Sequence, residues 1–214
     1  MKTSSLKICG IGHSHLDSIT HGYKANHKLF GDIKSFKYIS LVNKKYKSKN
    51  NYSFSIIYKL LIKIKFFNTD ILFCSFSGNA HNVIGLVNSD EPFDFFLNPK
   101  DEVCKNFKTR VLPKSLIKDV IKSHYGFYEF EWGIRNLRNL FPTKTIYCLE
   151  SPPPVPSNSY LVSNIDSHIP LLFRKDVKRK GFSSYSLRYK LWKVHSELAR
   201  DVCKKYNCKS KSHN

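Results

Sequence analysis

A serine flanked by two histidines follows the first apolar segment of the chain. Residues 6–11 form a short apolar run that predicts a buried strand, and Gly10 and Gly12 allow a sharp turn at its end. Ser14 follows this turn and begins a stretch that could be helical. A serine on a tight strand-to-helix turn exposes its hydroxyl at the carboxyl edge of a sheet, where open α/β sheets bind ligands. Ser14 is therefore a candidate nucleophile.

The same stretch supports two other interpretations. Ser14 could simply cap the following helix, because serine is favoured at that position. His13, His15 and Asp17 form a run of metal-type ligands, which resembles the HxHxDH signature of metallo-β-lactamase-like hydrolases, with Ser18 in place of the final histidine. A metal-dependent hydrolase that uses His13, His15 and Asp17 is thus an alternative.

A second polar turn follows a later strand. Residues 70–76 are a continuous apolar run, which is typical of a strand covered on both faces. The run ends in Ser77-Gly78-Asn79-Ala80-His81-Asn82. Asn79 could direct its side-chain amide to the same sheet edge as Ser14, although Asn and Gly are also ordinary turn residues.

The order of these motifs resembles the SGNH (GDSL-like) hydrolases, and more narrowly a bacterial subgroup with a Gly-Asn-x-His-Asn turn. Gly12-His13-Ser14-His15 matches the first block of that family, with His13 where Asp is usual, and Ser77-Gly78-Asn79 matches the third. The resemblance implies a three-layer, flavodoxin-like α/β fold with a parallel sheet. It also implies hydrolysis of a carbohydrate or lipid ester without a cofactor or metal.

The resemblance assigns roles to particular residues. Ser14 would attack the ester carbonyl, and the backbone amides of Ser14, of a glycine such as Gly78, and of Asn79 would bind the oxyanion. His15 and His81 are expected to contact the substrate.

The family also ends in a fifth strand and an Asp-x-x-His block that supplies the catalytic base, and this sequence contains no Asp-x-x-His. We therefore expect residues 1–214 to be a single, C-terminally truncated domain without the last strand. His15, His81 or His213 could replace the base, and a non-catalytic ligand-binding relative is a further alternative. Without a fifth strand, the uncharged edge between Thr145 and Glu150 is expected to mediate self-association.

The composition is that of a globular protein with a strongly basic balance. The 214 residues include 36 Lys and Arg against 16 Asp and Glu, a formal charge of +20. The lysines are spread along the chain, so no specific nucleic-acid partner is predicted. None of the six cysteines forms Cys-x-x-Cys, and neither a signal-peptide core nor a membrane-spanning run of about 18 apolar residues occurs. A cytoplasmic location is therefore expected.

The apolar patterns predict the remaining elements. Strands are expected at residues 36–42, 70–76 and 145–150, and helices at 54–67, from Pro113 onward and at 187–206. Residues 54–67 carry Lys59, Lys63 and Lys65, so that helix could cover the sheet with its lysines in water or lie on a membrane. Residues 157–184 are expected to be irregular.

Overall fold

The computed structural model describes residues 6–29, 31–41, 54–76, 80–101, 108–168 and 171–211. The chain divides into two compact units. The sheet unit comprises Met1–Gly78, Glu129–Ser151 and Ala199–Asn214, and the second unit comprises Asn79–Tyr128 and Pro152–Leu198. Their boundaries fall within α5 (Tyr125–Leu140) and α9 (Tyr185–Lys205), so both helices supply residues to both units.

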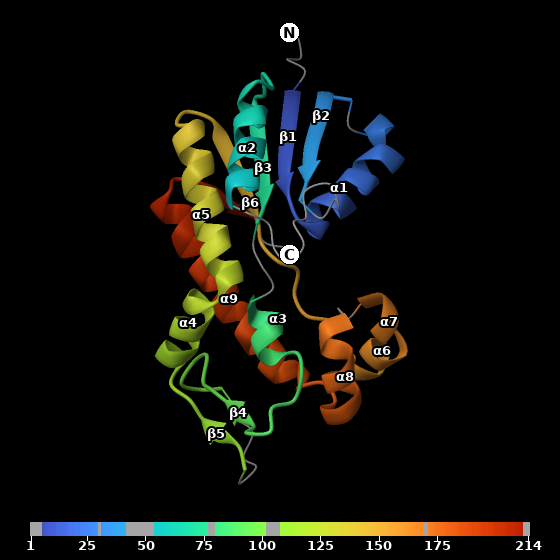
Figure 1. Ribbon diagram of the computed structural model, residues 1–214, viewed down its shortest axis with the longest axis vertical. Coiled ribbons are helices and arrows are strands. Elements are labelled where there is room, and N and C mark those ends of the chain that lie inside the picture. Colours follow the sequence, from blue (N-terminus) through green and yellow to red (C-terminus); the bar gives the residue numbers. More distant parts are fainter. Residues whose placement is uncertain are drawn as a thin grey trace. The chain divides into compact units, whose positions relative to one another are not determined.

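The sheet unit contains a five-stranded parallel sheet flanked by helices (Figure 1). Its strand order is β2-β1-β3-β6-β7, which is the flavodoxin-like order. The predicted α/β class and parallel sheet are therefore confirmed. The strands are β1 (Leu6–Gly12), β2 (Ile33–Ser40), β3 (Ile71–Ser75), β6 (Thr145–Leu149) and β7 (Lys209–Lys211).

Helices of the sheet unit bury one apolar face each. α1 (Ser14–Ala25) and a short 3-10 helix, η1 (His27–Leu29), connect β1 to β2, and α2 (Phe54–Lys65) precedes β3. Ile57, Leu60, Leu61 and Ile64 of α2 are buried, and its three lysines are exposed. The covering role predicted for this helix is thus confirmed. Among the described helices, none combines the length and the apolar character needed to cross a bilayer.

The expected absence of the last strand is wrong. β7 pairs with β6 in parallel, with Tyr147 opposite Lys209 and Leu149 opposite Lys211. The Glu150 amide also donates a hydrogen bond to the Lys211 carbonyl, 3.1 Å away. β7 is a Lys-Ser-Lys segment, so no apolar pattern marks it in the sequence. Because β7 covers the backbone edge of β6, the reason to expect self-association between Thr145 and Glu150 is removed.

The second unit is mostly helical, with one small parallel ladder between β4 (Phe93–Asp94) and β5 (Arg110–Val111). Its other elements are α3 (Ala80–Gly85), α4 (Lys114–Ser123), α6 (Asn158–Ser163), α7 (Ile165–His168) and α8 (Leu171–Lys180), with parts of α5 and α9.

Two sequence-based expectations about these helices are corrected. The stretch that follows Pro113 is not one helix, because it is interrupted at His124 between α4 and α5. Residues 157–184 are not irregular, because they form α6, α7 and α8. α6 and α7 are too short to display a helical period, and α8 is mostly charged. Leu161 of α6 and Val177 of α8 nevertheless form an apolar cluster with Leu86 and Phe182.

Candidate active site

The carboxyl end of β1 is fixed by a close contact with β3. A Cβ atom on Gly12 would lie 2.5 Å from the Ser75 carbonyl oxygen and 2.7 Å from the Ser75 Cβ, so only glycine fits there without displacement. The His13 amide donates to the Ser75 carbonyl at 3.0 Å, and the Leu41 amide donates to the Gly12 carbonyl at 2.7 Å. The backbone at the end of β1 is therefore fixed by hydrogen bonds to β3 on one side and to the residue that follows β2 on the other.

Ser14 is the first residue of α1, directly after this fixed turn. The structure thus places Ser14 in the strand–turn–helix position that the sequence predicts. The chain continues from β1 to its neighbour β2 and from β3 to its neighbour β6, in opposite directions across the sheet. The carboxyl ends of β1 and β3 therefore form the topological switch point where open sheets bind ligands. The first amides of α1 have no partner within the helix and carry partial positive charge, which favours a developing anion.

His13, beside Ser14 in the chain, lies next to a buried carboxylate. Its Nε2 atom is 3.4 Å from Oε1 of Glu129 on α5. Glu129 is only 7% exposed, so its carboxylate has lost most of its hydration, and the imidazole nitrogen of His13 lies beside it. A carboxylate that fixes the orientation of an imidazole is the arrangement found behind many nucleophilic serines.

A second buried carboxylate follows β6. Glu150 is 3% exposed; its Oε1 accepts a hydrogen bond from the Ser210 hydroxyl of β7 and lies 3.9 Å from Nε of Arg200. The next residue, Ser151, is 1% exposed. The inward hydroxyl of β7 therefore explains how a strand without apolar residues is held at the edge of the sheet.

Of the other residues predicted for the serine site, the structure describes the side chain of His81 alone. Gly78 and Asn79 lie outside the described residues, as do His213 and the side chains of Ser14 and His15. His81 belongs to α3 of the second unit and is only 2% exposed. Its predicted contact with substrate stays a prediction.

The ring of His81 packs inside the second unit. Its centroid lies 4.8 Å from that of His195 on α9, and the Phe127 ring meets His195 edge-on at 5.8 Å. Burial, with a smaller contribution from the neighbouring His124, lowers the pKa of His195 from 6.5 to about 4. His81 therefore neighbours an imidazole that is neutral at physiological pH.

The metal alternative gains no support from the described side chains. Asp17 accepts a hydrogen bond from the Ser40 hydroxyl at 2.9 Å, whereas His13 is directed to Glu129. Within the part of the chain that the structure describes, no three His, Cys, Asp or Glu residues converge as a metal-binding group would require.

The described cysteines are free, buried thiols: Cys9, Cys74, Cys148, Cys203 and Cys208. Burial raises the pKa of Cys9 to about 12. A thiol with so high a pKa is not a nucleophile at neutral pH. Burial also contributes to the raised pKa of the other four described thiols, so none of the five is a candidate nucleophile, and Cys104 lies outside the described residues.

Glu129 is the residue of this site that sequence reasoning missed. A glutamate within Tyr-Glu-Phe-Glu-Trp suggests a solvated helix face, and no motif distinguishes it. A usable signal was the helical period, because Glu129 precedes Gly133 and Leu137 at intervals of four and both of those are buried. A carboxylate on the apolar face of a helix is a candidate for a paired or functional group.

Comparison with known proteins identifies no family. No family model matches the chain, and no curated protein matches it. Among solved structures, the crystal structure of a structural-genomics target protein from Lactobacillus plantarum aligns with a TM-score of 0.39 and 10% identity, over 98% of this chain and 77% of that one. A likeness at this level carries no argument, so the fold class rests on the strand order of the chain itself.

Proposed function

We propose that the sheet unit carries the serine site of an SGNH-like acyl hydrolase that acts on a carbohydrate or lipid ester. The observation that carries this proposal is the placement of Ser14 at the start of α1, at the carboxyl end of the inner strand β1. The Gly12-His13-Ser14-His15 motif and its resemblance to the first block of that family support it further.

In this proposal the Ser14 oxygen attacks the ester carbonyl carbon, and the carbonyl oxygen becomes an oxyanion. The amides at the start of α1, with Gly78 and Asn79 as the proposed partners, stabilise that charge. The C–O bond to the alcohol breaks, the alcohol leaves with a proton, and water then hydrolyses the acyl-serine to a carboxylic acid and free Ser14.

His13 is the proposed base, in place of the missing Asp-x-x-His block. It adjoins Ser14 in the chain, and Glu129 fixes its imidazole through the 3.4 Å contact. A base positioned this way takes the serine proton directly or through one water molecule. Glu129 is then a positioning residue, because it acts through His13.

Hydrolysis of p-nitrophenyl esters from acetate to octanoate tests the proposal. Ser14→Ala is expected to lower kcat by a factor of about 10²–10⁴. Ser18→Ala, on the exposed surface of the same helix one turn later, is the matched control and should leave kcat unchanged. Equal rates for wild type and Ser14→Ala would exclude the serine mechanism. A wild-type chain that cleaves none of these esters would leave the non-catalytic ligand-binding alternative.

The same assay tests the base. Glu129→Gln keeps the size of the side chain but removes its charge, and kcat is expected to fall by about 10–100-fold with KM little changed. A variant with unchanged kcat would remove His13 and Glu129 from the mechanism.

A further inference from the structure

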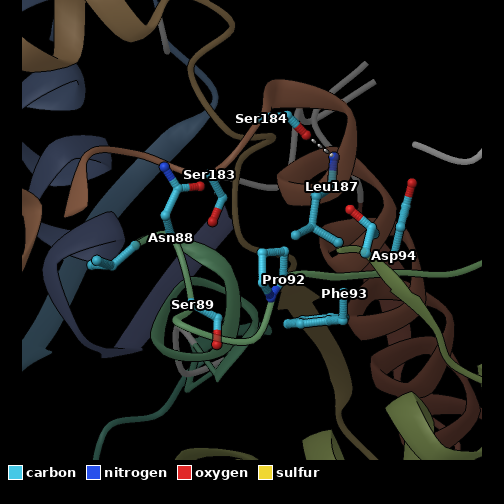
Figure 2. A pocket seen from close by; sticks show the side chains of 10 residues that line it. Asn88, Ser89, Pro92, Phe93, Asp94, Ser183, Ser184 and Leu187 are labelled. Atoms are coloured by element: carbon cyan, nitrogen blue, oxygen red, sulfur yellow. Dashed lines mark hydrogen bonds between the residues drawn. The ribbon is translucent and has the colours of Figure 1, made fainter. Parts of the chain in front are cut away.

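A pocket lined by both polar and apolar side chains lies within the second unit, away from any motif that the sequence singles out (Figure 2). It has a volume of about 200 Å³, and Asn88, Ser89, Phe93, Asp94, Ser183 and Leu187 are among the residues that line it. A second hollow of about 440 Å³ shares Ser89 and Phe93 with it. The two hollows therefore share the wall made by Ser89 and Phe93, and together they are called the groove.

The wall of the pocket is held by backbone pairing between two distant segments. Val87 and Phe182 form an isolated antiparallel bridge, and the Ser183 amide donates to the Leu86 carbonyl at 3.1 Å. Gly181, with a φ of 74°, turns the chain at the end of α8 into this pairing. The position of the Ser183 side chain is therefore set by the fold and not by a loose loop.

Ser183 leaves a hydroxyl without a partner in this wall. The residue is 3% exposed, and no residue that the structure describes forms a hydrogen bond with its Oγ atom. Figure 2 shows this hydroxyl on the same side of the pocket as the amide of Asn88, which is fixed by its Nδ2 donating to the Lys180 carbonyl at 2.9 Å. The Ser183 hydroxyl is open to the pocket, where it can donate a hydrogen bond to a ligand hydroxyl or accept one from it in place of water.

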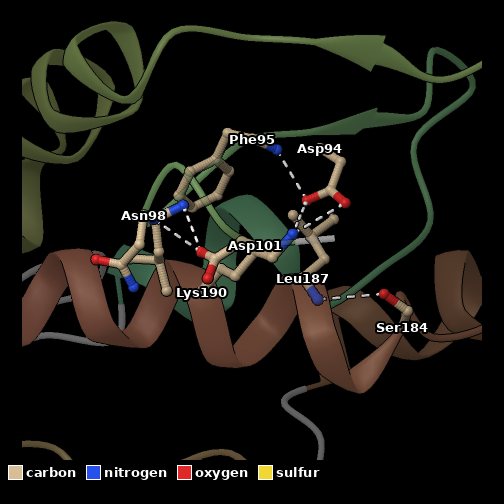
Figure 3. A network of polar contacts seen from close by, with 8 residues as sticks. Asp94, Phe95, Asn98, Asp101, Ser184, Leu187 and Lys190 are labelled. Atoms are coloured by element: carbon tan, nitrogen blue, oxygen red, sulfur yellow. Dashed lines mark hydrogen bonds and ion pairs between the residues drawn. The ribbon is translucent and has the colours of Figure 1, made fainter. Parts of the chain in front are cut away.

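The carboxylates around the groove are each matched by a cation. Asp94 accepts two hydrogen bonds from the buried Lys190 amine at 3.0 and 3.1 Å (Figure 3). In the second hollow, Glu91 pairs with Arg110 at 3.1 Å, and Asp90 pairs with Lys180. Because these charges cancel in pairs, the groove favours neither an anion nor a cation, although the chain as a whole carries +20.

We infer that this groove binds a neutral glycan, with one sugar ring in each hollow. The Phe93 ring offers an apolar surface for the C–H face of a sugar at the shared wall, while Ser183 and the Asn88 amide meet its hydroxyls. The inference does not depend on the chemistry of Ser14, because every residue of the groove belongs to the second unit.

Saturation-transfer NMR on the full chain tests the inference. The probes are cellobiose, maltose and N,N′-diacetylchitobiose at millimolar concentration, with digalacturonic acid as the charged comparison. At least one neutral disaccharide should receive saturation, and digalacturonic acid should receive less. No transfer to any neutral probe, or stronger transfer to the acid, would overturn the inference.

Two variants locate the binding. Ser183→Ala removes one oxygen that has no partner in the described structure, so folding should be preserved while affinity for the neutral probe falls about five- to tenfold. Phe93→Ala should abolish transfer, whereas Phe66→Ala, at an 81% exposed position in the sheet unit, should not change it. Binding that is equally strong in wild type and Ser183→Ala would show that the sugar lies elsewhere.

Discussion

The close contact between Gly12 and Ser75 leaves no room for a side chain at the end of β1. In Gly12→Ala the new Cβ would lie 2.5 Å from the Ser75 carbonyl oxygen, so β1 and β3 must separate by up to about 0.9 Å to restore an ordinary 3.4 Å contact. That movement would also lengthen the 3.0 Å hydrogen bond from the His13 amide to Ser75. Overpacking and a lost hydrogen bond together cost about 2–4 kcal/mol.

Urea unfolding measures this cost. With a slope of about 2 kcal/mol per molar urea, the midpoint of Gly12→Ala should fall by about 1–2 M. Gly22→Ala is the matched control, because Gly22 lies in α1 with no atom within 4 Å of the added Cβ. An alanine there should raise stability by about 0.5–1 kcal/mol. If Gly12→Ala unfolds at the wild-type midpoint, the close approach of β1 and β3 is refuted.

Three further predictions concern the rest of the fold. The pKa of His195 in the folded protein is lowered from 6.5 to about 4, so its contribution to the free energy of unfolding is fully present above pH 6.5 and is lost as the pH falls towards 4, by up to about 3 kcal/mol. The urea midpoint of His195→Phe should therefore depend less on pH between 6.5 and 4 than the wild-type midpoint does. Asp94→Asn should lower the free energy of unfolding by about 3–5 kcal/mol because it breaks the buried pair with Lys190, and a double replacement, Asp94→Leu with Lys190→Met, should recover part of the loss by the same measurement. In a dilute monomer, the amides of β6 should exchange with deuterium as slowly as those of β3, and faster exchange in β6 would contradict its pairing with β7.

The strands that the sequence predicts correctly are those whose own residues carry the signal. β3 and β6 are buried in the middle of the sheet, so their apolar runs report their position directly. β7 is held by its backbone pairing with β6 and by a hydrogen bond between Ser210 and Glu150, and nothing in a Lys-Ser-Lys segment predicts either contact. The helices α6 and α7 were missed because they span only six and four residues, and α8 was missed because most of its residues are charged.

The candidate site likewise has features that the sequence predicts and features that it does not. The position of Ser14 follows from local features, because an apolar strand, two glycines and a helix start are adjacent in the chain. The contact of His13 with Glu129 joins positions more than one hundred residues apart, and the need for glycine at position 12 depends on Ser75 of another strand. Such tertiary contacts become visible only once the sheet order is known.

The central claim is that Ser14 is a nucleophile, and covalent labelling with a fluorophosphonate tests it most directly. The reagent loses fluoride as a serine oxygen bonds to its phosphorus, so intact mass and peptide mapping report both the number and the position of the adducts. The account predicts one adduct per chain on Ser14, absent in Ser14→Ala, retained in Ser18→Ala and formed more slowly in Glu129→Gln. A folded wild-type chain that gains no adduct, or gains it on another serine, would contradict the account.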